Sequence, residues 1–284
     1  MREEALLFGE SQSLVGILSH PNREIMTDDA PGVLLLNAGF VHHVGPNRFS
    51  VNMARKLAGE GFPVLRFDFS GIGDSKVRAD HVQFEKSTID EIRQAMDFMQ
   101  GALGSKRFVL MGLCSGADNA IRAAYQDRRV VGTILMEPYA FLSNRYYLWA
   151  YGRQAFRYKS WCRLLRGSSE LWGVLQSKLN SSAQQTGDNW QEWLKEELVM
   201  NLQQIALRDI GLYFIYAEGG PAHYNYRVKL QDVLGKTVNR KNVHVMICPQ
   251  SDHLFSSLDH QALLYKEIRG WIMHSFQGKR SVPE

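Results

Sequence analysis

The chain has 284 residues, enough for one large domain with an insertion or for two small domains. Its formal charge of +4, from 33 basic and 29 acidic residues, is too small to indicate a nucleic-acid-binding protein, and no RNP, zinc-finger or P-loop motif is present. The three cysteines are far apart in sequence, so neither a disulfide framework nor a zinc site is expected. We expect a protein of a reducing compartment that needs no metal or other cofactor.

The first residues, Met1 to Ala5, are polar and lack the apolar core of a secretory signal. No later apolar run is long enough to span a bilayer. These features predict a cytoplasmic protein without a membrane span.

Short apolar runs alternate with helical patterns along most of the chain. Residues 5–8 and 14–18 flank a polar turn and predict an antiparallel hairpin. The later runs are too short for helices and are bounded by turn residues, as buried strands are; they lie at 32–36, 63–67, 108–111, 131–136, 212–217 and 243–247. Helical patterns occur at 49–59, 87–100, 114–125, 228–234 and 260–276. This alternation predicts an α/β fold with a mostly parallel sheet.

One interval interrupts the alternation, because about seventy residues separate the strand predicted at 131–136 from the next one, far more than a loop needs. Aromatic and basic side chains, Arg153 and Arg157 among them, are mixed in its first half, and an amphipathic helical pattern covers 190–207. We predict a helical lid at residues 139–208, inserted between the two parts of a core domain, 1–138 and 209–284. The two arginines either line a substrate pocket or belong to a helix with one solvated face.

The pentapeptide Gly112-Leu113-Cys114-Ser115-Gly116 directly follows an apolar run and precedes a helical pattern. A sharp turn from strand to helix accepts only small flanking residues and pushes its central side chain into an active site. Centring the turn on Cys114 places glycines at both flanks, whereas centring it on Ser115 places a bulky Leu113 there. Cys114 is the predicted nucleophile; the alternative is a small buried apolar residue near a strand end.

The elbow, a late Asp-His pair and the insertion make the chain resemble the α/β-hydrolase superfamily over nearly its whole length. It is most similar to the cysteine-nucleophile members. In the exosortase-A-system-associated hydrolases, a Gly-Leu-Cys elbow and an Asp-x-x-Gly-x-Gly-Asp-Ser segment correspond to residues 112–114 and 68–75. Dienelactone hydrolases, polyhydroxyalkanoate synthases and the Dieckmann cyclases of tetramate and tetronate pathways also carry cysteine in this elbow. The resemblance implies an α/β-hydrolase fold with helices on both faces of the sheet, and a structural role for Asp68 and Asp74.

The resemblance also assigns the general base, because the nucleophile comes first and the histidine last in this superfamily. His253 takes that place here; the alternative is a solvent-exposed histidine in a surface loop. Cys114 would lie at the start of a helix, where free amides and the helix dipole favour a thiolate.

The sequence offers more than one candidate for the acid that orients the histidine. Most members supply it after the penultimate strand, but Gly220 stands at the expected position. Glu218 lies close to that position, and Glu137 directly follows the strand predicted at 131–136, from which some members supply the acid. We prefer Glu137, with a salt bridge to the lid as its alternative role. Asp252 directly precedes His253 and is less suitable as the orienting acid, because the side chains of adjacent residues rarely face each other.

Acyl transfer needs donors for the developing oxyanion. By similarity to the family, the backbone amides of Ser115 and Phe40 would supply them, the latter from the loop that follows the first parallel strand. Ala38 stands where the family often has histidine, which leaves the backbone donor unaffected. His42 and His43 follow in the same loop and are expected to form the pocket wall rather than a metal site, since no further ligand lies at a suitable spacing.

The predicted function is hydrolysis of a small-molecule ester or thioester through a Cys114 acyl-enzyme. One alternative keeps this intermediate but passes the acyl group to a substrate carbon, oxygen or nitrogen, as an acyltransferase or a Dieckmann-type cyclase; the basic insertion could then dock an acyl carrier protein. A second alternative is a non-catalytic ligand-binding scaffold, which Gly220 favours. The sequence does not specify an oligomeric state.

Overall fold

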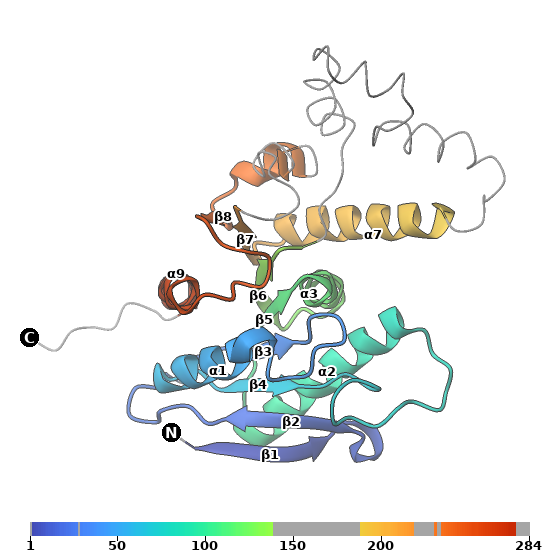
Figure 1. Cartoon of the computed structure of the whole chain (residues 1–284), viewed down its shortest axis with the longest axis vertical. Coiled ribbons are helices and arrows are strands. Elements are labelled where there is room, and N and C mark those ends of the chain that lie inside the picture. Colours follow the sequence, from blue (N-terminus) through green and yellow to red (C-terminus); the bar gives the residue numbers. More distant parts are fainter. Residues whose placement is uncertain (1, 28, 139–187, 219–229, 232–233, 277–284) are drawn as a thin grey trace, which may run out of the picture.

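The computed structural model describes residues 2–27, 29–138, 188–218, 230–231 and 234–276. Within these residues the chain forms one eight-stranded sheet with helices on both faces (Figure 1). The strands, in chain order, are β1 (Glu3–Phe8), β2 (Leu14–Ser19), β3 (Gly32–Leu36), β4 (Val64–Phe67), β5 (Phe108–Leu113), β6 (Val130–Met136), β7 (Gly211–Ala217) and β8 (Val243–Cys248).

The strands have the spatial order β1-β2-β4-β3-β5-β6-β7-β8. β1 and β2 form an antiparallel hairpin and β2 pairs antiparallel with β4, whereas the neighbouring pairs from β4 to β8 are parallel. The carboxyl ends of the parallel strands therefore meet at one edge of the sheet. Open α/β sheets bind their ligands at this edge.

The helices cover the sheet in two layers. One face carries α1 (Phe49–Gly59) and α9 (Leu258–Phe276), which contact each other. The other face carries α2 (Phe84–Leu103), α3 (Ser115–Gln126) and α7 (Asp188–Leu207), with α3 in contact with both of its neighbours. None of the helices in the described part of the chain has the length and apolar character needed to cross a membrane.

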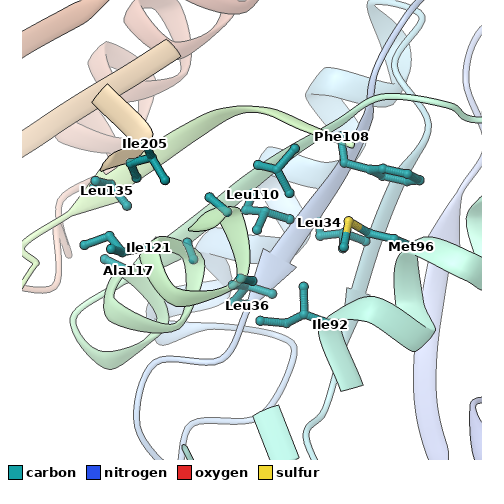
Figure 2. Packing of buried hydrophobic residues seen from close by; sticks show 14 of the residues in the cluster. Leu34, Leu36, Ile92, Met96, Phe108, Leu110, Ala117, Ile121, Leu135 and Ile205 are labelled. Atoms are coloured by element: carbon teal, nitrogen blue, oxygen red, sulfur yellow. The ribbon is translucent and has the colours of Figure 1, made fainter. Parts of the chain in front are cut away.

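Apolar side chains from α2, α3 and α7 interlock with those of the central strands (Figure 2). Members of this cluster include Leu34, Leu36, Ile92, Met96, Leu110, Ile121, Leu135 and Ile205. Burying each large aliphatic side chain stabilises the fold by about 1.5–3 kcal/mol. The packing fixes α3 against β5, and with it the turn that joins them.

The structure confirms the α/β-hydrolase fold and the predicted order of its elements. The helix predicted at 49–59 coincides with α1, and the predicted strands agree with β3 to β8 except for a few residues at their ends. Of the helix predicted at 228–234, residues 230–231 and 234 are helical, and the other positions lie outside the described residues.

Most of the predicted lid lies outside the described residues, and so do Arg153 and Arg157. The described part of the insertion is α7, which coincides with the amphipathic pattern at 190–207. Its Leu198, Leu202 and Ile205 are buried in the core cluster, and the helix packs beside α3. The division of the chain at residues 138 and 208 stays a prediction.

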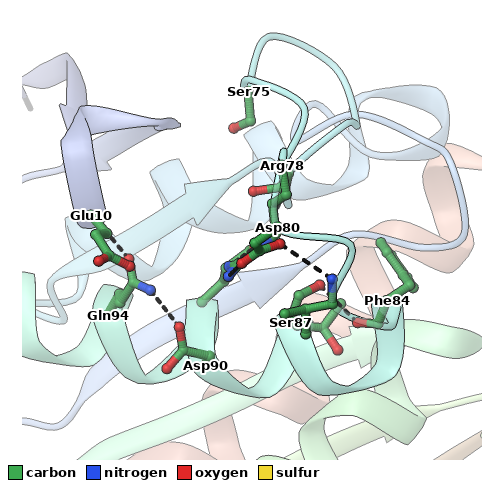
Figure 3. A network of polar contacts seen from close by, with 12 residues as sticks. Glu10, Ser75, Arg78, Asp80, Phe84, Ser87, Asp90 and Gln94 are labelled. Carbon is green, nitrogen blue, oxygen red and sulfur yellow. Dashed lines mark hydrogen bonds and ion pairs between the residues drawn. The ribbon is translucent and has the colours of Figure 1, made fainter.

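Polar contacts join the segment after β4 to α2, and α2 to the turn between β1 and β2 (Figure 3). Buried Glu91 accepts hydrogen bonds from Arg78 at 3.2 Å and from the Ser70 amide at 2.8 Å. The side-chain oxygen of Gln94 accepts the Glu10 amide at 2.7 Å. These contacts hold the turn after β4 in place beside the carboxyl edge of the sheet.

Candidate active site

Cys114 lies in the turn between β5 and α3, at the carboxyl edge of the sheet. Its φ of 54° and ψ of −120° put a non-glycine residue in a strained region of the backbone map. A Cβ on Gly112 would lie 2.2 Å from the Gly116 carbonyl carbon, and a Cβ on Gly116 would lie 2.6 Å from the Asn37 oxygen. The close approach of these chain segments therefore requires glycine on both sides of Cys114.

The Cys114 side chain is exposed, whereas Cys248, the other cysteine of the described residues, is buried. The Cys114 amide donates to the Met136 carbonyl at 2.9 Å, and its own carbonyl accepts the Ala117 amide at 2.9 Å. The residue is thus held by β6 on one side and by the first turn of α3 on the other. The N-terminus of a helix favours negative charge on a group placed there.

His253 and Glu137 face each other across the ends of β6 and β8. His253 Nδ1 lies 3.3 Å from Glu137 Oε2, and the histidine side chain is 38% exposed. Hydrogen bonds with Cys114 and with Glu137 raise the pKa of His253 to about 10. The structure therefore brings together three of the four residues predicted as catalytic.

Glu137 is fixed by the neighbouring strand β7. It directly follows β6 with a φ of 46°, and its amide donates to the Ile215 carbonyl at 2.9 Å. Its Oε1 accepts a short hydrogen bond from the Ala217 amide, which leaves Oε2 for His253. Two main-chain contacts thus aim this carboxylate at the histidine.

The other acidic candidates have different partners. Glu218 Oε2 accepts the Gln250 amide at 2.8 Å, so this side chain supports the loop that leads to His253. The Asp252 carboxylate accepts the Leu254 amide at 2.8 Å and a hydrogen bond from the Ser256 hydroxyl, and these contacts lower the pKa of Asp252. Asp252 therefore shapes the histidine loop. Gly220 lies outside the described residues.

The loop after β3 lies against the elbow. Ala38 to Val41 form a turn in which the Val41 amide donates to the Ala38 carbonyl at 3.1 Å, and Gly39 has a φ of 56°. The Gly39 amide donates to Ser115 Oγ at 2.8 Å, while the Phe40 side chain is 91% exposed. The turn's own hydrogen bond does not use the Phe40 amide. Ser115 begins α3, where the first amides have no partner within the helix.

A fully buried carboxylate supports this loop from below. Asp68 accepts the amide of His43 at 2.6 Å, the ring Nδ1 of His43 at 2.7 Å, the Asn37 side chain at 3.0 Å and the Asp74 amide at 3.1 Å. Burial alone would raise the pKa of Asp68, but hydrogen bonds from His43, Asn37 and Asp74 outweigh it and lower that pKa. These contacts agree with the structural role expected for Asp68.

The grouping of His43, Asp68 and Asp74 was missed at the sequence level, because the loop and the turn are distant in the chain. Ligand atoms of the three residues lie within 4.8 Å of one another. Hydrogen bonds account for the contacts of both Asp68 oxygens, so the cluster needs no ion to explain it. His42 is exposed; it lines a pocket beside the elbow together with Leu35 and Met136.

Comparison with known proteins agrees with this architecture. Residues 28–201 match the model of a family described as serine aminopeptidase, S33. Among solved structures, the esterase Pf2001 of Pyrococcus furiosus is similar with a TM-score of 0.61 and 15% identity, over 98% of this chain and 91% of that chain. An alpha-beta serine hydrolase homologue from Coxiella burnetii has a TM-score of 0.56 and 14% identity, over 94% of this chain and 98% of that chain.

The serine hydrolase XC6422 from Xanthomonas campestris, described as lacking a lid, is similar with a TM-score of 0.56 and 15% identity, over 98% of this chain and 97% of that chain. At these identities the likeness shows the fold alone. A search of curated proteins found no match to the chain.

Proposed function

The chain belongs to the serine aminopeptidase S33 family of α/β-hydrolases, and we propose that it hydrolyses an ester or thioester. We further propose that Cys114, rather than a serine, is its nucleophile. The observation that carries the proposal is the position of His253, which lies 3.3 Å from Glu137 and whose pKa is raised by hydrogen bonds with Cys114 and with Glu137. A nucleophile, a base and an orienting acid in this arrangement are the parts of a catalytic triad.

Several features favour Cys114 over Ser115 as the nucleophile. Cys114 has the positive φ at the apex of the turn and an exposed thiol, and glycines flank it at the two positions where a Cβ would clash. Ser115 is the first residue of α3, and its hydroxyl oxygen already accepts the Gly39 amide. A thiolate is also a stronger nucleophile near neutral pH than a hydroxyl.

The proposed reaction has two steps. The Cys114 thiolate attacks the substrate carbonyl carbon, and the tetrahedral intermediate collapses to a thioester as the leaving group takes a proton from His253. Water then gives a proton to His253 and attacks the thioester carbon, and collapse of the second tetrahedral intermediate releases the carboxylic acid and restores the thiolate–imidazolium pair. Glu137 holds the imidazole in place in both steps, and the amides of Phe40 and Ser115 would bind the oxyanion.

The alternative functions differ from hydrolysis in the fate of the acyl group. A cyclase or acyltransferase would use the same acyl-enzyme, and the basic first half of the insertion, which could dock a carrier protein, lies outside the described residues. A binding scaffold is favoured by Gly220 in the sequence, but Glu137 offers the histidine a carboxylate partner from another strand. We therefore take hydrolysis as the proposed outcome.

Intact-mass spectrometry with p-nitrophenyl acetate and with short acyl thioesters tests this proposal. We expect an acyl adduct on the wild-type protein that is lost in Cys114→Ala, retained in Ser115→Ala, and converted with time to free acid. Conversion to a cyclised product would instead favour the cyclase. An adduct located on Ser115, or no adduct from any of these donors, would contradict a cysteine nucleophile.

A further inference from the structure

The Ser115 side chain joins two parts of the candidate site that are distant in sequence. Its Oγ accepts the Gly39 amide at 2.8 Å, which links the first residue of α3 to the tip of the loop after β3. None of the proposed catalytic roles uses this hydroxyl. The contact instead bears on how the loop is held.

The base and the tip of this loop are held in different ways. At the base, the Asn37 carbonyl packs so closely on Gly116 that no Cβ fits between them, and the Asn37 amide group donates to the Val41 carbonyl at 2.8 Å. At the tip, a Cβ placed on Gly39 would meet nothing within 4 Å, and the Phe40 side chain is almost fully exposed. Side-chain packing therefore does not position the tip against the described residues.

The hydrogen bond to Ser115 acts at the tip itself. The Phe40 amide, the proposed oxyanion donor, belongs to the peptide unit that follows Gly39. Because the hydrogen bond from the Val41 amide to the Ala38 carbonyl closes the turn around both peptide units, anchoring the Gly39 amide restricts where the Phe40 amide points. Oxyanion donors must lie about 2.7–3.1 Å from the oxygen they stabilise. A displacement of about 1 Å in such a site costs about a hundredfold in rate.

We propose that Ser115 is a positioning residue, whose hydroxyl holds the Phe40 amide in the oxyanion hole. This inference rests on the proposed function. Ser115 thus acts twice, through its main-chain amide as a donor and through its side chain as the acceptor that orders the facing loop. The role explains a hydroxyl at the residue after the nucleophile without making that hydroxyl a second nucleophile.

Two reactions of Cys114 separate this role from a general structural one. Acylation by p-nitrophenyl acetate passes through an oxyanion, whereas alkylation by iodoacetamide displaces iodide and forms no oxyanion. We would measure both rates, under single-turnover conditions, for wild type, Ser115→Ala and Ser115→Thr. Threonine keeps the hydroxyl and is the matched control.

We expect acylation of Ser115→Ala to be slower by about 10- to 100-fold, its alkylation to stay close to the wild-type rate, and Ser115→Thr to recover most of the acylation rate. Unchanged acylation in Ser115→Ala, or an equal fall in both of its rates, would overturn the positioning role. Wild-type protein that is alkylated but never acylated at Cys114 would instead overturn the proposed function, and this inference with it.

Discussion

The two carboxylate oxygens of Glu137 have different partners. Its Oε1 is occupied by the Ala217 amide, and its Oε2 faces His253. A carboxylate restrained in this way needs little reorganisation when the imidazole gains a proton, which is the requirement on the acid of a triad. Glu218 follows the next strand, yet its carboxylate is turned toward the Gln250 amide.

Replacing the two glutamates in turn tests this assignment. Glu137→Gln should lower kcat by about 10²- to 10⁴-fold, because the amide no longer stabilises the imidazolium or fixes its tautomer. Glu218→Gln is the matched control and should lose far less, since its partner is a main-chain amide. Steady-state hydrolysis of p-nitrophenyl acetate measures both. A larger loss in Glu218→Gln than in Glu137→Gln would reverse the assignment.

The close contacts of the elbow glycines determine how their replacement changes the stability of the fold. Gly116→Ala places a Cβ 2.6 Å from the Asn37 oxygen, so the loop after β3 must move, at a cost of about 1–3 kcal/mol or more in unfolding free energy. Gly101→Ala, in α2, meets nothing within 4 Å and should stabilise by about 0.5–1 kcal/mol. Urea denaturation measures both. Equal stabilities for the two variants would show that the close approach at Gly116 is not maintained in solution.

The loop after β3 is held in place by the buried carboxylate of Asp68. Each oxygen of Asp68 accepts two hydrogen bonds, from donors in the loop and in the turn after β4. An asparagine in its place presents an NH₂ group to two of those donors in either orientation. The loop and the turn are therefore coupled through one ionised, buried side chain.

Asp68→Asn should lower the free energy of unfolding by about 2–4 kcal/mol at neutral pH. Because the folded-state pKa of Asp68 is lowered, its stabilisation is present above the usual value of 3.8 and is lost as the pH falls through the folded-state pKa. The difference between wild type and variant should thus shrink in acid. Urea denaturation at a series of pH values checks this, and a difference that does not depend on pH would exclude Asp68 as the charged support.

The elements themselves could be predicted from sequence, because buried parallel strands appear as short apolar runs bounded by turn residues. The acid could be narrowed to Glu137 or Glu218, since each follows a strand at the same edge of the sheet. Sequence favoured Glu137 but left Glu218 open, because the direction of a side chain just past a strand depends on tertiary contacts. Here the Ala217 amide holds Glu137, and the Gln250 amide holds Glu218.

At the scale of the whole molecule, four segments from distant parts of the chain build the site: the loop after β3, the elbow after β5, the residue after β6 and the loop after β8. Parallel pairing brings all four to one edge, so the fold and the positions of Cys114 and His253 can be predicted from the order of elements. The pairing of His43 with Asp68 cannot be predicted in this way, since neither the spacing nor the composition of those two segments indicates it.

The charge state of the site should be visible in the stability of the whole fold. Hydrogen bonds with Cys114 and Glu137 raise the pKa of His253 to about 10, above the ordinary value of 6.5. A raised folded-state pKa contributes stability that is fully present below pH 6.5 and is lost as the pH rises through about 10. The interaction between His253 and Glu137 should therefore stabilise the fold at pH 7 and should be largely absent at about pH 11.

A double-mutant cycle measures that interaction directly. His253→Gln, Glu137→Gln and the double variant are unfolded in urea beside wild type at pH 7 and again at high pH, and the coupling free energy is taken at each pH. We expect a favourable coupling at pH 7 that vanishes as the pH passes about 10. Because the histidine is partly exposed, added salt should weaken the coupling at pH 7. A coupling that is absent at pH 7, or that grows with rising pH, would mean that the imidazole is not held as a cation beside Glu137.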